Sequence, residues 1–387
     1  MEGSELNILI AADLVPKENN NELFEEGNIK EILGSKLNSI WQNADYKIFN
    51  IEAPITECNE NNKIKKCGPN LRINPKVMKG IKSLNPTCVT LANNHIMDYG
   101  KIGKDDTVKY LDNNKIDWIG IGTNRKDIRK TYIIENGLKK VGIYNCCETE
   151  FSVATEKEDG ANGIDMLCIY NDINELKKIC DFVTVIYHGG KEYYRYPSPY
   201  LQKVCRKIID YGADIIICQH SHCIGCYENY SNGKIIYGQG NFIFDGPNNE
   251  FWNESLLVEL KINDKIEINY IPIVKTEYGT KLADEQKAKE IINQFNKRSK
   301  EITQKDFVKK TYKEFAKTKI EDYLIYLHGN NIIFKIINKL CFNKLIRKMY
   351  SQKSLLSILN VIECEAHREL LIEGLKEEIY KGRKNYE

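Results

Sequence analysis

The 387-residue sequence has almost no net charge and no long apolar run. It contains 56 Lys and Arg residues against 54 Asp and Glu residues, a formal net charge of +2. This balance excludes a global field that would select nucleic acid or an anionic membrane, so any charge-based function is local. No segment reaches the ~18 consecutive apolar residues of a spanning helix, and the N-terminus lacks a basic region followed by a long apolar stretch. We therefore expect no transmembrane segment, no nucleic-acid partner and a cytoplasmic location.

The sequence also offers little support for a disulfide framework, although cysteine is abundant. The thirteen cysteines are odd in number, and many lie within apolar runs, such as Cys88 in NPTCVTLANN and Cys218 in ADIIICQH. Such positions suit buried free thiols in a reducing compartment. The cysteine pattern therefore agrees with the expected cytoplasmic location.

Length and composition indicate a large domain and a smaller one. The hydrophobic fraction of 42% and the charged fraction of 28% are those of an ordinary globular protein. Because 387 residues exceed the usual size of one core, two units are expected. Beyond Thr280 glycine becomes less frequent and long amphipathic stretches follow. We expect one domain over residues 1–279 and an α-helical C-terminal domain over residues 280–387.

Short apolar runs alternate with segments of helical periodicity along the first 245 residues. The runs are LNILIAAD, DYKIFNIE, PTCVTLANNH, KKVGIYNCCE, DFVTVIYHGG and ADIIICQHSH. This pattern predicts a layered α/β domain with strands buried on both faces. Helices are expected at 25–42, 74–84, 105–114, 173–180 and 199–212. An alternating pattern over 255–275, broken at Asn263-Asp264, predicts a hairpin that completes a second sheet.

Five of the six apolar runs end at a residue that can bind a metal ion or move a proton. These residues are Asp13, Glu52, Asn94 with His95, His188, and His220 with His222. Strand ends share one rim in an open α/β sheet, so the side chains can converge despite their separation in sequence. Any one of them alone is better explained as an ordinary polar residue at a strand exit. That explanation is weaker for the whole set, because the chain has only six histidines and four of them fall at these strand exits.

The residue types favour a site for divalent metal ions. Carboxylates, an amide and imidazoles supply oxygen and nitrogen ligands, which suit Mn, Fe or Zn. The His220-x-His222 spacing lets both rings face one cavity and contact two ions ~3.5–4 Å apart, with Glu52 as a bridge. Asn94 offers a neutral carbonyl oxygen, and the adjacent His95 can donate a proton to a leaving oxygen.

Together the motifs resemble the CapA family of capsule and poly-γ-glutamate synthesis proteins (PGA_cap domain), within the calcineurin-like metallophosphatase superfamily. The resemblance covers residues 6–275 and rests on AADLVP, FNIEAPIT, LANNHIMDYG, YHGGKEYY, DYGADIIICQHSH and YGQGNFIFD. It implies a metallophosphatase-like layered β-sandwich flanked by helices. It also implies that one or two metal ions are bound by Asp13, Glu52, Asn94, His188, His220 and His222, with His95 as the acid.

The sequence departs from the metallophosphatase pattern at Val15, where a histidine commonly follows the first aspartate by two residues. The resemblance therefore leaves open a single-metal site or a loosely held second ion. Candidate substrate-binding residues are Asn93, Glu192, Arg195 and Asn241. In the segment KEYYRYPSPY, a substrate rim and a solvated helix entrance with packed tyrosines are equally compatible with the sequence.

The resemblance implies two alternative functions in capsule or poly-γ-glutamate biosynthesis. The first is a metal-dependent hydrolase of phosphoesterase type that acts on an anionic surface polymer or its precursor. The second is a non-catalytic component that binds the polymer or a capsule synthase protein. The basic, apolar segment 331–350 leaves a peripheral membrane contact open, although packing against neighbouring helices is the favoured interpretation.

Overall fold

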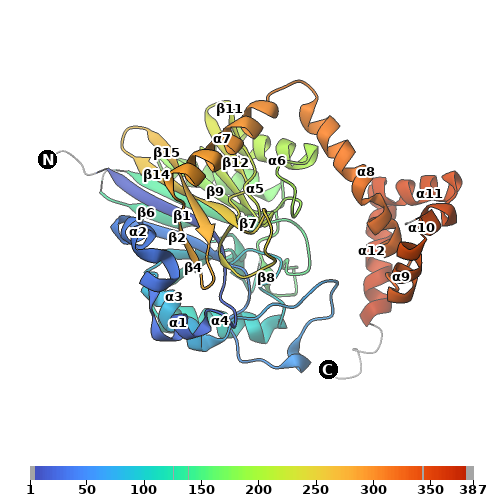
Figure 1. The fold of residues 1–387 in the computed structure, drawn as a ribbon, viewed down its shortest axis with the longest axis horizontal. Helices are drawn as coiled ribbons and strands as arrows, with labels where there is room; N and C mark the ends of the chain where they lie inside the picture. The colour runs from blue at the N-terminus through green and yellow to red at the C-terminus, as the bar shows by residue number, and fades with distance from the viewer. Residues whose placement is uncertain (1–4, 125, 138, 342–343, 381–387) are drawn as a thin grey trace. The chain divides into compact units, whose positions relative to one another are not determined.

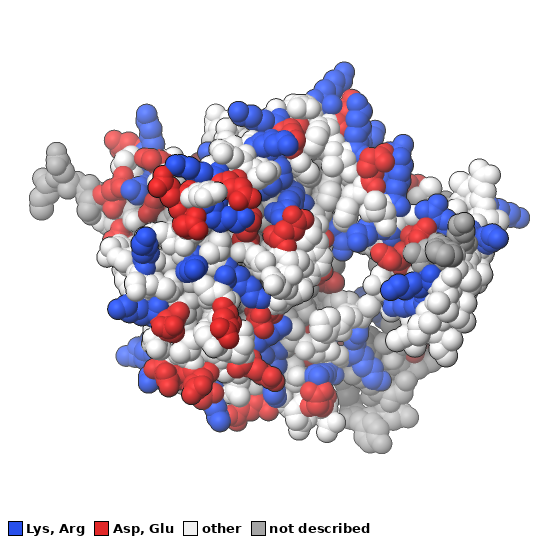
Figure 2. Space-filling model, viewed as in Figure 1, with Lys and Arg blue, Asp and Glu red and all other residues white. Residues whose placement is uncertain are grey.

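The computed structural model describes residues 5–124, 126–137, 139–341 and 344–380. The chain divides into two compact units, Met1–Lys309 and Lys310–Glu387. Acidic and basic side chains are interspersed over the face shown in Figure 2, as the nearly zero net charge suggests.

Two mixed β-sheets form the centre of the first unit (Figure 1). In spatial order the first sheet contains β16 (Thr280–Leu282), β15 (Ile266–Lys275), β14 (Glu254–Ile262), β1 (Leu6–Val15), β2 (Tyr46–Ile51), β3 (Cys88–Thr90) and β4 (Asp117–Ile119), and β13 (Asn241–Phe244) also pairs with β1. The second contains β11 (Tyr227–Tyr230), β12 (Gly233–Tyr237), β10 (Ile215–Gln219), β9 (Phe182–His188), β7 (Lys140–Cys147) and β6 (Tyr132–Glu135). A further pair consists of β5 (Ile121–Gly122) and β8 (Gly160–Ala161).

The central strands of both sheets are buried on both faces, as the burial of β1 and β10 shows. Ile8 and Ile10 of β1 belong to the same apolar cluster as Ile217 of β10, which lies between the two sheets. Leu9 points to the opposite face of β1, where it shares a cluster with Trp41. Alternation of side chains along a strand places successive residues on opposite faces. The two sheets therefore form a sandwich with an apolar interior.

Helices cover the outer faces of the sandwich. The first sheet is covered by α1 (Asn21–Glu26), α2 (Ile29–Asn43), α3 (Met78–Ser83) and α4 (Gly100–Asn113), and the second by α5 (Cys168–Ile179) and α6 (Pro199–Asp210). Among the described residues, 3-10 helices span Glu60–Asn62, Pro75–Val77 and Asp127–Arg129. The five helices expected from periodicity correspond to α2 through α6. The predicted layered β-sandwich flanked by helices is confirmed.

Parallel pairing brings several strand ends to the same place in each sheet. In the first sheet β1, β2, β3 and β4 run parallel, and in the second β7, β9, β10 and β12 run parallel. Asp13 of β1 lies opposite Asn50 of β2 on one side and Asn241 of β13 on the other. The residues that follow these strands are therefore neighbours in space.

Two features differ from those expected from the sequence, namely the sheet to which the hairpin belongs and the end of the first unit. The hairpin β14–β15 extends the first sheet by pairing with β1, and so does not complete a second sheet. Helix α7 (Glu285–Glu301) buries Ile291 and Phe295 in the cluster between the sheets. Because α7 packs on the sandwich, the first compact unit runs to Lys309 and not to residue 279. Independent folding of the C-terminal helices stays a prediction.

The described residues of the second unit form helices joined by short connections. Its helices are α8 (Phe307–Leu327), which begins in the first unit, α9 (Ile332–Leu340), α10 (Lys344–Met349), α11 (Gln352–Glu363) and α12 (Glu365–Tyr380). A small core joins Leu324 and Ile325 of α8 to Ile346 of α10. Among the described helices of the chain, none is both long and apolar enough to cross a bilayer.

Candidate metal centre

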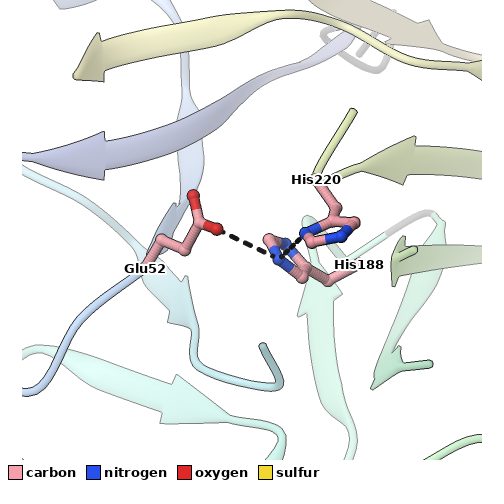
Figure 3. A group of neighbouring side chains, drawn as sticks. All are labelled: Glu52, His188 and His220. Atoms are coloured by element: carbon pink, nitrogen blue, oxygen red, sulfur yellow. Dashed lines mark hydrogen bonds and ion pairs between the residues drawn. The ribbon is translucent and has the colours of Figure 1, made fainter. Parts of the chain in front are cut away.

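The six expected metal ligands come from the ends of strands in both sheets. Asp13 lies near the end of β1, Glu52 directly follows β2 and Asn94 lies in the turn after β3; His188 ends β9, and His220 and His222 follow β10. All six are buried. Figure 3 shows the side chains of Glu52, His188 and His220 directed toward one another.

The first group of candidate ligands surrounds one ring nitrogen of His188. His188 Nε2 lies 3.1 Å from Asn94 Oδ1 and 3.1 Å from His220 Nδ1. The same nitrogen lies 3.3 Å from Glu52 Oε1. Ligands held ~2.0–2.2 Å from a single ion lie roughly 3.0–3.6 Å apart. The spacing of these atoms is therefore that of a metal coordination shell.

The second group consists of Asp13, Glu52 and His222, which can each place a ligand atom within 4.8 Å of the others. His222 Nδ1 lies 4.0 Å from Asp13 Oδ2. Burial raises the pKa of Asp13, and the nearby Glu52 carboxylate raises it further. Since Glu52 belongs to both groups, the strand-end residues converge on one site. Their roles as ligands stay a prediction.

The residues present fit a divalent cation. Both carboxylate oxygens of Glu52 are buried and accept no hydrogen bond. A buried carboxylate without hydrogen-bond donors is costly, because it loses its hydration without compensation. A cation placed among Glu52, Asp13 and the imidazoles would compensate both negative charges. The mixed oxygen and nitrogen ligand set is also that of Mn, Fe or Zn sites.

The turn after β10 holds an unusual backbone conformation. His220 has φ 81° and His222 has φ 51°, both in the left-handed region that non-glycine residues rarely adopt. Their ring centroids lie 6.1 Å apart. Strained φ values of this kind persist where the surrounding structure enforces them, typically at functional sites. The turn therefore keeps both imidazoles at the same site.

His188 is held as a neutral imidazole. Burial lowers the pKa of His188 to about 3. Its Nδ1 lies 3.4 Å from Asn50 Nδ2 and 3.6 Å from Asp13 Oδ1, whereas Nε2 faces the first group. A neutral ring is the form that binds a metal, and contacts at the other nitrogen fix its orientation. Asn50, which also donates to Asp13 Oδ1 at 2.7 Å, was not expected from the sequence.

Glu148 is the main residue of the site that the sequence did not assign. It directly follows β7, and its Oε1 lies 3.3 Å from His220 Nε2. Burial opposes a charge on His220, but Glu148 outweighs it and raises the pKa of His220 to about 9. A signal was present, because KKVGIYNCCE also ends in a carboxylate and was the one apolar run without an assigned residue.

His95 lies beside a buried ion pair. Its Nδ1 is 2.7 Å from Asp98 Oδ2 and 3.1 Å from Lys66 Nζ, and Lys66 is ion-paired with the other oxygen of Asp98. The side chain of His95 is 12% exposed, whereas those of Lys66 and Asp98 are nearly inaccessible. With Nδ1 directed at Asp98, Nε2 is the atom that can hold or release a proton. The role of His95 as the acid stays a prediction.

The four candidate substrate-binding residues fall into different environments. Asn93 is buried, and its amide donates to Asn50 Oδ1 and Ile51 O while its oxygen accepts from the His95 amide at 3.0 Å. Asn241 Oδ1 lies 2.8 Å from His222 Nδ1. These contacts orient neighbouring groups of the site, and the substrate-binding roles of Asn93 and Asn241 stay a prediction.

Arg195 and Glu192 lie in the segment after β9. Arg195 donates to the backbone oxygens of Ile224 and Glu250, and its guanidinium lies 4.8 Å from the centroid of the Phe251 ring. Glu192 is half-buried, and its charge helps to raise the pKa of His220. Arg195 therefore anchors the 250–252 segment, whereas Glu192 acts electrostatically on the site.

An aromatic wall on one side of the site was not expected from the sequence. The ring of His222 stacks on Trp252 at 4.7 Å with an interplanar angle of 19°. Phe244 meets the same imidazole edge-on at 5.4 Å, and Tyr193 lies 6.2 Å away. Phe251 contacts Tyr193 in turn. Most of these residues come from loops without periodicity, so no sequence signal indicated their convergence.

Comparisons with known proteins agree with the motifs. The capsule biosynthesis protein CapA of Bacillus anthracis is 30% identical over 234 residues, which cover 58% of this chain and 56% of that protein. The PGA biosynthesis protein CapA of Bacillus subtilis (strain 168) is 32% identical over 271 residues, 67% of this chain and 70% of that protein. The alignment thus spans little more than half the length of the first relative.

Two solved structures share a similar arrangement of elements. The first is a putative 5'-nucleotidase from Staphylococcus aureus, with 14% identity and a TM-score of 0.47; the match covers 76% of this chain and 58% of that one. The second is a phosphatase from Mycoplasma pneumoniae, with 16% identity and a TM-score of 0.45; the match covers 70% of this chain and 94% of that one.

The family profile described as bacterial capsule synthesis protein PGA_cap matches residues 7–246. This segment is more than half of the 387 residues and contains all six candidate metal ligands. On that match, the chain belongs to the bacterial capsule synthesis protein PGA_cap family.

Proposed function

We propose that this protein is a metal-dependent hydrolase of phosphoesterase type that acts in the biosynthesis of capsule or poly-γ-glutamate. Membership of the PGA_cap family supports the biological process. Two relatives are named for capsule and PGA biosynthesis. The chemistry is supported by the buried ligand groups at the strand ends.

The observation that carries the proposal is the position of Glu52. It is shared by two groups of candidate ligands, and neither of its buried oxygens accepts a hydrogen bond. A carboxylate that served only the fold would be expected to have hydrogen-bond donors, as buried polar groups generally do. A residue placed between two ligand groups suits a bridging ligand of a two-metal site.

Each residue of the site then has a distinct role. Asn94, His188 and His220 would hold one ion and Asp13 and His222 the other, with Glu52 common to both. Mn, Fe or Zn at these positions would supply positive charge that polarises a phosphoryl or acyl oxygen. His95 would donate a proton from Nε2 to the leaving oxygen, with Asp98 orienting the ring through Nδ1. Asn50 and Glu148 orient His188 and His220.

The substrate we propose is an anionic surface polymer or its precursor, and capsule synthase proteins are the proposed partners. A divalent-metal site suits anionic substrates, because the ions compensate the substrate charge. The second candidate function is a non-catalytic component that binds the polymer. Val15 favours it, because this valine is buried in the apolar core at the position where metallophosphatases commonly carry a histidine.

One experiment separates the two candidates. The full chain is purified, its metal content is measured, and hydrolysis of a generic phosphomonoester and a generic phosphodiester is assayed with added Mn²⁺ or Zn²⁺. The hydrolase predicts bound metal and metal-dependent turnover that Glu52→Gln abolishes. Glu259→Gln, on β14, serves as a matched control. Absence of both metal and turnover would reject the hydrolase in favour of the binding component.

A further inference from the structure

Helix α9 of the second unit exposes a continuous apolar face. Ile332, Ile333 and Leu340 are 72%, 65% and 75% exposed, and Ile336 and Ile337 are also exposed. Residues spaced by three or four positions lie on the same side of a helix. These five aliphatic side chains therefore form one stripe, which we call the α9 face.

The α9 face is directed away from the core of its own unit. Phe334, on the opposite side of α9, packs against the small core of Leu324, Ile325 and Ile346. Asn338, one turn further along that side, accepts a hydrogen bond from the Ile346 amide at 3.0 Å. The orientation of the helix is thus fixed by its inner side. Packing against neighbouring helices, the interpretation favoured by the sequence, accounts for Phe334 but not for the α9 face.

The chain around α9 is strongly basic. Residues 323–362 contain no Asp or Glu, and their basic residues are Lys335, Lys339, Lys344, Arg347, Lys348 and Lys353. The whole chain, by contrast, has a net charge of only +2. By helical spacing, Lys335 and Lys339 lie along one edge of the α9 face. Lysines at the edge of an apolar face can place their charges at lipid headgroups while the face enters the acyl region.

Helix α12 shows that exposed leucines alone are not the distinguishing feature. Leu370, Leu371 and Leu375 of α12 are also exposed. That helix, however, carries five glutamates among its sixteen residues. Its charge opposes binding to an anionic surface, whereas that of segment 323–362 favours it.

We propose that the second unit binds the surface of an anionic lipid bilayer through the α9 face, with Lys335 and Lys339 at the headgroups. Apolar insertion and electrostatic attraction act together in such interfacial helices. Such a helix lies in the plane of the interface, with its apolar face in the boundary between headgroups and acyl chains. It would hold the chain at a membrane independently of metal binding at the first unit.

The test measures co-sedimentation of the full-length protein with vesicles. Vesicles of phosphatidylcholine and phosphatidylglycerol mixed about 2:1 are compared with vesicles of phosphatidylcholine alone. We expect binding to the anionic vesicles to be at least ~10-fold tighter, and to weaken as salt is raised. The triple variant Ile333→Gln, Ile336→Gln, Leu340→Gln should lower binding by about tenfold or more, because it removes the inserted face while keeping good helix formers.

Two matched controls separate this surface from general effects. Leu370→Gln, Leu371→Gln, Leu375→Gln removes as many exposed aliphatic residues from acidic α12 and should leave binding within about twofold. Lys335→Gln with Lys339→Gln should weaken anionic binding roughly tenfold, whereas Lys30→Gln with Lys36→Gln on α2 should not. Circular dichroism verifies that each variant keeps its helices.

Three results would overturn the proposal. The first is equal or absent binding to both kinds of vesicle. The second is binding that the α9 variants leave unchanged. The third is a dimer in sedimentation velocity that the α9 triple variant dissociates while vesicle binding persists, which would make a second copy of this chain the occupant of the α9 face.

Discussion

The two compact units each place some residues in an unfavourable environment: the first buries charged groups, and the second exposes apolar side chains. In the first unit, Glu52, Asp13 and three imidazoles are buried at the ends of apolar strands, where charge is costly. In the second, the aliphatic side chains of α9 are exposed, where apolar surface is unfavourable. In the first unit neither oxygen of Glu52 accepts a hydrogen bond, and in the second the aliphatic residues of the α9 face stay exposed. The comparison teaches that a buried charge and an exposed apolar face can each point to a partner outside the chain, for which we propose a cation in the first unit and a lipid surface in the second.

The largest effect is expected from Glu52→Gln, which keeps the shape of the side chain and removes its charge. Turnover should fall by ~10³-fold or more, since both ligand groups lose a shared anion. Without metal, the same variant should be more stable than the wild type by about 1–3 kcal/mol, because an uncompensated buried carboxylate is gone. Urea denaturation of both proteins in the presence of a chelator measures the sign of this difference in the free energy of unfolding. A variant less stable than the metal-free wild type would mean that Glu52 is compensated by the fold.

His95→Ala and His220→Ala should separate a proton donor from a metal ligand. His95→Ala should retain bound metal and fold while turnover falls by ~10²-fold or more, the usual size of a lost general acid. His220→Ala should lose metal affinity and recover part of its activity in excess Mn²⁺ or Zn²⁺. Elemental analysis and kinetics on the same preparations provide the comparison. Equal metal loss in the two variants would make His95 a ligand.

Metal affinity should rise with pH by roughly tenfold per unit between pH 7 and 9, because an ion must displace the proton of His220. Glu148 raises the pKa of His220 to about 9, so the ring is charged below that pH and neutral above it. Glu148→Gln should flatten the dependence in this range. Isothermal titration at several pH values measures the slope. The control Glu135→Gln, at the end of β6 and outside the site, should keep the pH dependence of the wild type. An unchanged slope in Glu148→Gln would argue against a proton on His220 in this pH range.

The smallest effect is expected from removing the second unit. Truncation after Lys309 should change the free energy of unfolding of the sandwich by less than ~1 kcal/mol, since the deleted residues belong to the other unit. Truncation after Asp284 provides the contrast. It removes α7 with Ile291 and Phe295 and should cost at least ~3 kcal/mol or leave an insoluble product. Similar stability of the two truncated chains would support a domain boundary near residue 280.

The sequence was informative where a signal was local. Five of the six apolar runs ended in a candidate ligand of their own, so Asp13, Glu52 and His188 were assigned without knowledge of strand order. The family motifs reinforced these assignments. The apolar character of successive residues along each run likewise predicted strands buried on both faces, as Ile8 and Leu9 show.

Interactions between distant segments could not be predicted in the same way. Glu148 meets His220 because β7 and β10 both pair with β9, which is a property of strand order. Lys66 reaches His95 from a loop that has no periodicity. The amphipathic pattern of α7 indicated that one face is buried, but not that the sandwich buries it. For that reason the first compact unit extends past the boundary expected at residue 279.

Equilibrium dialysis of the metal-free protein against Mn²⁺ or Zn²⁺, followed by elemental analysis, tests the central claim most directly. The wild type and Glu259→Gln should each bind one or two ions per chain. Glu52→Gln should bind at least ~10²-fold more weakly, because it lacks the carboxylate shared by both ligand groups. Equal metal binding by wild type and Glu52→Gln, or no binding by either, would contradict the assignment of these strand-end residues as a metal centre.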